Sequence, residues 1–280
     1  MQYTINSMTE HQTGAEVLGL DLKAPVSDEL RSALHAEFAK YHILVFRNQK
    51  LAAPDFARAG RLFGDIMPQH HADKRSHEHP DVFEIRNEQI GPGKYHVPGE
   101  NFHTDHSNHA CPPKATALHP VSLPSYGGDT QFINMHNAYD DLTDAMKRRI
   151  HGLKAVHVFH SKLSPRKVRA LASSAQPLAP NTHPIVRLHP ENGRKALYLN
   201  PLRMESIVGM PDDEAIDLIN ELMAHATQSK YEYRHRWHYG DMVIWDNRSL
   251  LHQANADYDM SETRHLYRII IVGEPVLAAA

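Results

Sequence analysis

The sequence predicts a mainly β protein with flanking helices, arranged as a jelly-roll barrel. Short runs of branched and aromatic residues recur along the chain, and turn residues separate them. A few amphipathic helical patterns interrupt these runs without the regular alternation of a parallel α/β sheet. No repeat, low-complexity stretch or linker divides the 280 residues, so we expect a single domain over 1–280. A jelly roll is the fold that fits this pattern best.

The first third of the chain predicts two helices, a strand and a long loop. Residues 28–41 repeat apolar side chains at the spacing of one helical face. The apolar run 42–46 predicts a strand, and 54–64 predicts a second helix with a proline near its start and a glycine at its end. Between about 66 and 102 the pattern dissolves into His, Gly and Pro, with 82–86 the only strand-like run. Loops of this length are often functional, so we expect an active-site lid here.

The rest of the chain predicts strands with two further helices. Two strands fill 114–134, and an Asn-Gly turn within 183–200 indicates a hairpin. Helices are expected over 140–151 and 212–227, and three strand-like runs occupy the last sixty residues. The residues expected to face the core are Leu142, Ala145, Met146 and Ile150 in the first helix and Ile216, Ile219, Met223 and Ala226 in the second.

Composition excludes two classes of partner. Thirty basic residues against 33 acidic ones give a net charge of −3, without the basic excess that nucleic-acid binding needs. No run of 18 apolar residues and no leader-like N-terminus occurs, so we expect a soluble cytoplasmic protein that does not bind a membrane. The single cysteine, Cys111, cannot form an internal disulfide, which fits a reducing compartment, and we expect it to be buried. Small molecules are the expected partners.

A His-x-Asp triplet is the first candidate metal site, although the chain has 23 histidines and such triplets arise by accident. It occurs three times, at residues 71–73, 79–81 and 103–105. In a strand, residues i and i+2 share a face, so His103 and Asp105 can point at one ion while a third ligand comes from elsewhere. Two imidazoles and a carboxylate suit Fe(II) oxygen chemistry, but zinc hydrolases use similar ligands. The ligand types alone therefore leave both chemistries open.

The surroundings of the third triplet distinguish it from the other two. HTDHSNHACPPKATAL is followed by SYGGDTQFINMHNAYDDL, and WHYGDMVIWDNRSLLHQANADYDMSETRHLYR lies near the end of the chain. These segments resemble the family of taurine dioxygenase and 2,4-dichlorophenoxyacetate dioxygenase (TauD/TfdA), which are Fe(II)- and 2-oxoglutarate-dependent enzymes. Their fold is a double-stranded β-helix, a cupin-like jelly roll. The likeness covers most of the chain, is most specific in GRKALYLN and GDMVIWDNR, and is weakest between 66 and 102.

The resemblance implies roles for five residues of the active site. It makes His103, Asp105 and His252 the iron ligands. The threonine after the double glycine is Thr130, which would hydrogen-bond a carboxylate of 2-oxoglutarate. Arg264, about a dozen residues past the distal histidine, would pair with the far carboxylate of the same molecule.

Substrate contacts are expected from four further residues. Arg268 matches the position that binds the anionic group in small-acid members of the family, and on a strand it would share a face with Arg264. Guanidinium groups suit bidentate contact with carboxylates or sulfonates. His70, or the histidine that follows it, is a candidate for the substrate-binding histidine of the family, and His106 and Asn108 are expected to line the pocket. The taurine enzyme has an aromatic residue where this chain has Asn108, which argues against taurine as the substrate.

The implied activity is hydroxylation of a small anionic organic substrate, with Fe(II), 2-oxoglutarate and O2 as cofactors and co-substrates. 2-Oxoglutarate would be decarboxylated to succinate and CO2, and the product could undergo C–O, C–S or C–N cleavage. Related halogenases lack the carboxylate at the position of Asp105, so its presence favours oxygenation. The residues Asp246, Asn247 and Arg248 are expected to orient the segment that bears His252. A homodimer or homotetramer is the expected assembly.

Two other functions stay open at the level of sequence. One is a zinc-dependent hydrolase or isomerase on a cupin-like barrel, which would have no use for Thr130 and Arg264. The other is a protein that binds a small anion without turnover. The substrate itself is open among phenoxyalkanoates, sulfonates, alkyl sulfates, amino acids and larger natural-product acids.

Overall fold

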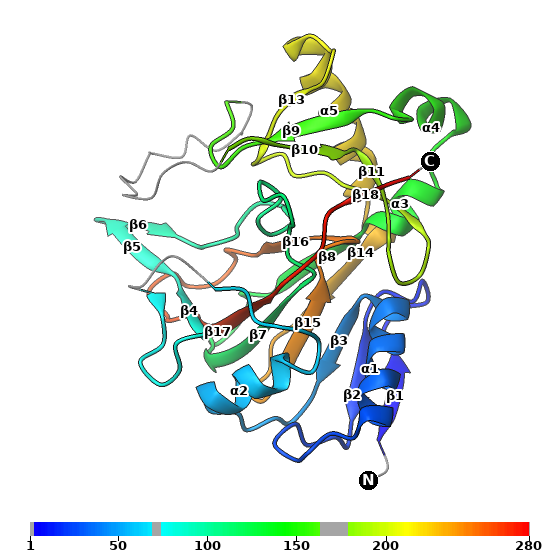
Figure 1. The fold of residues 1–280 in the computed structure, drawn as a ribbon. Coiled ribbons are helices and arrows are strands. Elements are labelled where there is room, and N and C mark those ends of the chain that lie inside the picture. The colour runs from blue at the N-terminus through cyan, green and yellow to red at the C-terminus, as the bar shows by residue number, and fades with distance from the viewer. Residues whose placement is uncertain (1–2, 69–73, 163–178, 280) are drawn as a thin grey trace.

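The fold is mainly β, with a few helices around the sheets (Figure 1). The structure is a computed structural model that describes residues 3–68, 74–162 and 179–279. The largest sheet has seven strands in the spatial order β1 (Thr4–Ser7), β2 (Ala15–Leu18), β3 (Ile43–Phe46), β15 (Met242–Asp246), β7 (Ala115–Ser122), β17 (His265–Ile271) and β4 (Phe83–Arg86). A second sheet has the order β14 (Glu232–His235), β8 (Thr130–Asn134) and β16 (Leu250–Ala254).

Smaller sheets and the helices complete the described part of the chain. Two three-stranded sheets consist of β10 (Asn181–Pro184), β9 (Lys154–His157) and β13 (Met204–Ile207), and of β12 (Lys195–Leu197), β11 (Val186–Leu188) and β18 (Leu277–Ala278). A two-stranded hairpin contains β5 (Glu88–Gly91) and β6 (Lys94–His96). The helices are α1 (Asp28–Tyr41), α2 (Ala53–Gly60), α3 (Met135–Asp140), α4 (Asp144–Ile150), α5 (Asp212–Ala226) and the 3-10 turn η2 (Ser229–Tyr231).

Alternation along the strands of the seven-stranded sheet builds two cores, one on each face. In β15, Met242 and Ile244 pack with residues of α1 and α2, whereas Val243 and Trp245 pack against the β14–β8–β16 sheet. All four side chains are buried. Successive strand residues point to opposite faces, so a strand of consecutive apolar residues is covered on both sides: by the helices on one face and by the second sheet on the other. The β14–β8–β16 sheet thus lies against the inner face of the large sheet.

The helix predicted over 28–41 is confirmed with the same bounds as α1. The side chain of Ser27 accepts a hydrogen bond from the backbone of Leu30, which caps the first turn. The helix ends at His42, which has a left-handed backbone with φ 65°. The predicted strand 42–46 therefore starts one residue late, at Ile43.

The helix predicted over 140–151 is confirmed only over 144–150, as α4; residue 140 ends α3, and residues 141–143 are not helical. The Asn134 side chain caps the start of α3, and the Thr143 side chain caps the start of α4, so each helix has its own N-terminal signal. Leu142 and Ile150 are buried as expected, but Ala145 is exposed. Helix 212–227 is confirmed as α5, although Ile216 is exposed and Leu218 and Leu222 face the core.

The loop predicted over 66–102 contains three strands, two of them unforeseen. β4 is the edge strand that pairs with β17, and β5 and β6 form a hairpin that projects from the body of the molecule (Figure 1). Most residues of the hairpin are exposed or half-buried, so they carry none of the apolar alternation that marks a buried strand. Cys111 is exposed, contrary to expectation. None of the helices in the described ranges combines the length and apolar character needed to cross a bilayer.

Candidate active site

Two side chains from one turn of chain and a third from a distant strand converge at one point, and we call them the pocket triad: His103, Asp105 and His252. The backbones of the two histidines pair directly, with His103 N–H donating to His252 O at 3.0 Å and His252 N–H donating to His103 O at 2.8 Å. Nε2 of His103 lies 3.7 Å from Asp105 Oδ1, and Nε2 of His252 lies 3.9 Å from Asp105 Oδ2. One ligand atom from each residue lies within 4.8 Å of the other two, so the triad could hold a metal ion.

Hydrogen bonds set the orientation of the triad. His103 Nδ1 donates to the carbonyl of Asn101 at 2.7 Å, so the lone pair of the ring is on Nε2, the atom near Asp105. Thr116 Oγ1 donates to Asp105 Oδ2 at 2.6 Å and accepts from Asn247 Nδ2 at 2.9 Å. Sequence reasoning missed Thr116. The available signal was a polar residue inside an otherwise buried apolar strand.

The segment expected to orient His252 is itself held by buried bonds. Trp245 Nε1 donates to Asn247 Oδ1 at 3.1 Å, and the Trp245 ring lies 4.6 Å from the His252 ring, centroid to centroid. Arg248 donates to both carboxylate oxygens of Asp246, at 2.9 and 2.7 Å. These contacts leave little freedom to the strand that carries His252.

Burial and charge keep the triad in the protonation states that a metal needs. Burial lowers the pKa of His252 to about 3 and also lowers the pKa of His103, so both rings are neutral at neutral pH. Burial raises the pKa of the Asp105 carboxyl, but interactions with the groups around it, among them His252, His103 and the charged Arg268, outweigh burial and hold that pKa well below its usual value. The site therefore presents two neutral imidazoles and one carboxylate.

Arg264 and Thr130 are in contact in the same pocket. Arg264 Nε donates to the carbonyl of Gly128 at 2.8 Å, and its Nη2 lies 3.4 Å from Thr130 Oγ1. Trp237 Nε1 donates to the same Thr130 oxygen at 3.0 Å. Gly128 has φ +67°, and a Cβ there would lie 3.1 Å from Arg264 Cδ, so glycine suits this close approach. Burial lowers the pKa of Arg264 to about 10, and the group stays charged at neutral pH.

One pocket brings together the pocket triad, Thr130 and both predicted arginines. Arg264 and Arg268 lie two residues before and two residues after Leu266, whose side chain is buried in the core between the sheets, so the two arginines point to the same side of the strand as Leu266. The pocket is lined by Ile85, Pro98, Gly99, His103, Asp105, Thr116, Leu118, Thr130, Trp245, His252, Ala254, Arg264 and Arg268.

Three further substrate contacts were predicted: His70, His106 and Asn108. His106 and Asn108 are not among the described residues that line the pocket. His106 has a left-handed backbone, with φ 44°, in the turn after Asp105, and its ring lies 5.1 Å from that of His109, centroid to centroid. Asn108 is buried, and its carbonyl accepts a hydrogen bond from Asn181. His70 lies outside the described residues.

Comparison with known proteins places this pocket in a family. The family model described as "Taurine catabolism dioxygenase TauD, TfdA family" matches residues 4–270. The chain belongs to this family. It is 32% identical over 273 residues to the alpha-ketoglutarate-dependent 2,4-dichlorophenoxyacetate dioxygenase of Burkholderia sp. (strain RASC), an alignment that covers 92% of this chain and 91% of the relative.

Solved structures of TauD/TfdA members agree with this fold. A taurine dioxygenase from Burkholderia xenovorans superposes with a TM-score of 0.82 at 30% identity, covering 99% of this chain and 93% of the other. AAD-2, solved in complex with Mn(II) and N-oxalylglycine, superposes with a TM-score of 0.80 at 26% identity, covering 99% and 100% of the two chains. This TauD/TfdA member is therefore an alpha-ketoglutarate (2-oxoglutarate)-dependent dioxygenase, an enzyme class that uses Fe(II), 2-oxoglutarate and O2.

Proposed function

We propose that His103, Asp105 and His252 hold Fe(II), and that the enzyme hydroxylates a small anionic organic substrate while 2-oxoglutarate is converted to succinate and CO2. The observation that carries the proposal is the meeting of the pocket triad with two arginines, the buried Arg264 and the half-buried Arg268, in one pocket. Two neutral imidazoles and a carboxylate are the donor set that suits non-heme Fe(II) and leaves positions open for other ligands. When bound, the iron with 2-oxoglutarate and O2 supplies the oxidising power, and the protein supplies binding and orientation.

Thr130 and Arg264 are the proposed 2-oxoglutarate contacts. The guanidinium of Arg264 is buried and charged, and such a group binds a carboxylate well when it is pre-positioned. Its bonds to Gly128 and Thr130 provide that positioning. The Mn(II) and N-oxalylglycine complex of AAD-2 supports this assignment, because N-oxalylglycine is a dicarboxylate like 2-oxoglutarate.

Arg268 is the proposed anchor for the substrate anion. A second, half-buried guanidinium in the same pocket favours a second anion beside 2-oxoglutarate. Apolar side chains of Ile85, Leu118 and Trp245 line the same pocket and would hold the carbon skeleton near the pocket triad. If the attacked carbon bears oxygen, sulfur or nitrogen, the hydroxylated product can then collapse with cleavage of that bond. His70, His106 and Asn108 remain predicted substrate contacts.

The double-stranded β-helix, the single domain over 1–280 and the lid at about 66–102 belong to the same proposal. Two sheets pack face to face, and the pocket triad lies on their strands and loops, which supports a barrel of the double-stranded β-helix type. Pro98 and Gly99 line the pocket, and Ala254 N–H donates to Gly99 O at 2.8 Å, which supports the lid. A homodimer or homotetramer and a cytoplasmic location remain predictions.

A panel of small anions tests the proposal directly. Phenoxyalkanoates, sulfonates and alkyl sulfates are screened for stimulation of succinate release from 2-oxoglutarate with Fe(II) and O2. Arg268→Ala should lose that stimulation by about 30-fold or more and keep the slow turnover without substrate, because the ion pair with the substrate anion is lost. Arg268→Lys is the matched control that keeps the charge but loses bidentate geometry. Full stimulation of Arg268→Ala by the same anion would exclude Arg268 as the anchor.

The same assay separates the two alternatives that the sequence left open. A zinc hydrolase would work without 2-oxoglutarate, and an anion-binding protein would release no succinate. Wild-type enzyme that consumes no O2 with iron and 2-oxoglutarate supplied would overturn the proposed activity.

A further inference from the structure

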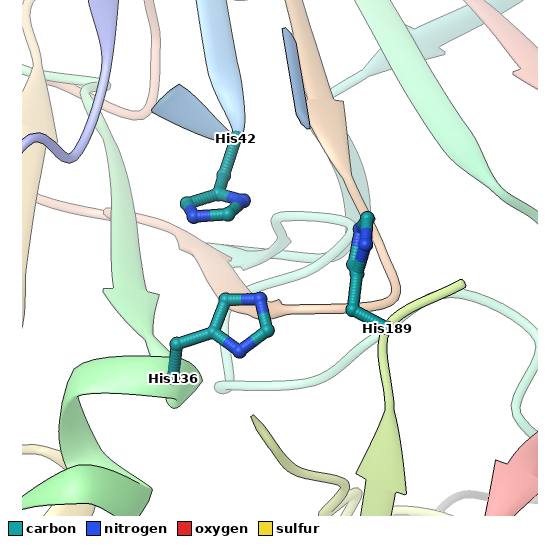
Figure 2. A group of neighbouring side chains, drawn as sticks. All are labelled: His42, His136 and His189. Atoms are coloured by element: carbon teal, nitrogen blue, oxygen red, sulfur yellow. The ribbon is translucent and has the colours of Figure 1, made fainter. Parts of the chain in front are cut away.

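A second group of histidines lies away from the pocket, and we call it the buried histidine cluster: His42, His136 and His189. One ring nitrogen from each lies within 4.8 Å of the others. Their relative exposures are 1%, 0% and 0%, and none of them lines the pocket. Figure 2 shows the three rings turned toward one another from separate segments of the chain.

Three structural elements bring these rings together. His42 ends α1 and precedes β3, His136 is in the first turn of α3, and His189 follows β11. The ring centroids are 4.8 Å apart for His42 and His136, 5.5 Å for His136 and His189, and 6.2 Å for His42 and His189. These segments do not belong to one sheet or helix, so the cluster joins three parts of the fold.

Two of the rings present an unused nitrogen to the interior. His136 Nδ1 donates to the carbonyl of Lys195 at 2.8 Å, which leaves the lone pair on Nε2. His42 Nδ1 pairs with Ser249 Oγ at 3.2 Å. Nε2 of both rings is buried and has no hydrogen-bond partner among the residues that the structure describes. Buried nitrogen atoms of this kind are normally satisfied.

The surroundings of these rings keep them neutral and hold them in place. Burial lowers the pKa of His136 to about 4 and lowers the pKa of His42 well below its usual value, so both offer lone pairs at neutral pH. A ring whose other nitrogen is fixed by a carbonyl, as in His136, matches the way in which metal-binding histidines are usually oriented.

His189 is the third and weakest candidate ligand. Its Nε2 donates to Asp246 Oδ2 at 3.0 Å, and its Nδ1 accepts from the backbone N–H groups of Glu191 and Asn192 at 3.3 and 3.2 Å. A metal ion at either nitrogen must replace one of these bonds. Nitrogen atoms around one zinc ion lie about 3.4 Å apart, so the three rings must also move inward by about 1 Å.

We propose that His42, His136 and His189 form a second metal site, selective for a nitrogen-preferring divalent ion such as Zn(II). The all-imidazole donor set distinguishes it from the pocket triad, whose carboxylate suits Fe(II). Bound metal ties α3 and the turn after β11 to the start of β3, so its role is structural. Complete burial also predicts that chelators remove this ion slowly.

Counting Zn(II) bound by the metal-free full-length protein tests the site. Wild type should bind two equivalents, Asp105→Ala/His252→Ala one, and His42→Asn one. Asparagine is chosen because it tolerates the left-handed backbone of His42. His136→Gln is the second variant, and circular dichroism of each metal-free variant checks folding. Two equivalents retained in both His42→Asn and His136→Gln, or a single equivalent in wild type that is lost in Asp105→Ala/His252→Ala, would overturn the proposal.

A second measurement uses a variant in which the three histidines of the buried histidine cluster are unchanged. Its result therefore does not depend on whether the cluster variants fold. X-ray absorption at the zinc edge of Asp105→Ala/His252→Ala should show at least two imidazole nitrogens at about 2.0–2.1 Å. Zn(II) should also raise the melting temperature of this variant in a concentration-dependent way. An oxygen-only shell, or zinc that EDTA removes at once, indicates surface binding or a water molecule between the rings and contradicts the site.

Discussion

The pocket triad and the buried histidine cluster are built from similar parts and lie in different surroundings. The pocket triad unites residues from two distant segments and the buried histidine cluster from three, in each case within 4.8 Å. The pocket triad includes a carboxylate and shares its pocket with two arginines, whereas the buried histidine cluster consists of imidazoles closed off from solvent. The difference teaches that ligand spacing alone does not identify a catalytic metal. A catalytic metal site is identified by access for co-substrates and by charged groups that bind those co-substrates.

The largest effect that sharpens this comparison is expected from Asp105→Ala. Removing a direct ligand should lower 2-oxoglutarate turnover by more than about 100-fold, since loss of an outer hydrogen bond to a ligand already costs about 10–100-fold. The matched change in the other cluster, His136→Gln, should leave turnover at the wild-type rate. Succinate release measured for both variants checks this, and equal losses in the two would mean that the clusters do not differ in function.

A smaller effect is expected from Thr116→Val, which removes the 2.6 Å hydrogen bond to Asp105 with little change of shape. We expect a loss of about 10–100-fold in Fe(II) affinity, measured by anaerobic equilibrium dialysis. Thr182→Val, at an exposed strand position, is the control and should bind Fe(II) as wild type does. Unchanged affinity in Thr116→Val would show that the carboxylate is oriented by other contacts.

The smallest effect is a pH dependence of stability at a buried histidine outside both clusters. Burial lowers the pKa of His157 to about 3, and the ordinary value is 6.5. Between these values the unfolded chain binds more protons than the folded one, so the free energy of unfolding falls as the pH drops. The loss is up to about 1.4 kcal/mol per pH unit for one histidine.

Urea unfolding of metal-free protein at about pH 7 and about pH 5 measures this slope. His157→Gln cannot titrate, so its slope should be shallower by the contribution of one histidine. Equal slopes in the two proteins would mean that His157 is protonated to the same extent in the folded and unfolded chains.

Elements with local signals were predictable from the sequence. The capped helix α1 and the β11–β12 hairpin with its Asn-Gly turn occur as expected, because capping and turn residues act within a few positions. Strands β5 and β6 were not predictable, since exposed strands of this kind are fixed by their pairing with each other rather than by an apolar pattern of their own. The late start of α4 depends on the Thr143 cap, which lies inside the predicted amphipathic pattern 140–151.

The two clusters also differ in how far they could be predicted from the sequence. The residues of the pocket triad could be singled out because a recognisable family pattern surrounds them. The residues of the buried histidine cluster stand in three unrelated patterns, among 23 histidines that hide any spacing signal. Thr116 and Asn247 likewise acquire their roles only where β7 meets the segment after β15. Contacts between strands that are distant in sequence decide such roles.

The central claim is that His103, Asp105 and His252 bind one ferrous ion that drives 2-oxoglutarate turnover. Simultaneous measurement of O2 uptake and succinate release, with wild type and His252→Ala compared under saturating Fe(II), tests it most directly. We predict coupled O2 uptake and succinate release in wild type, and neither above background in His252→Ala. Undiminished turnover in His252→Ala would contradict the claim.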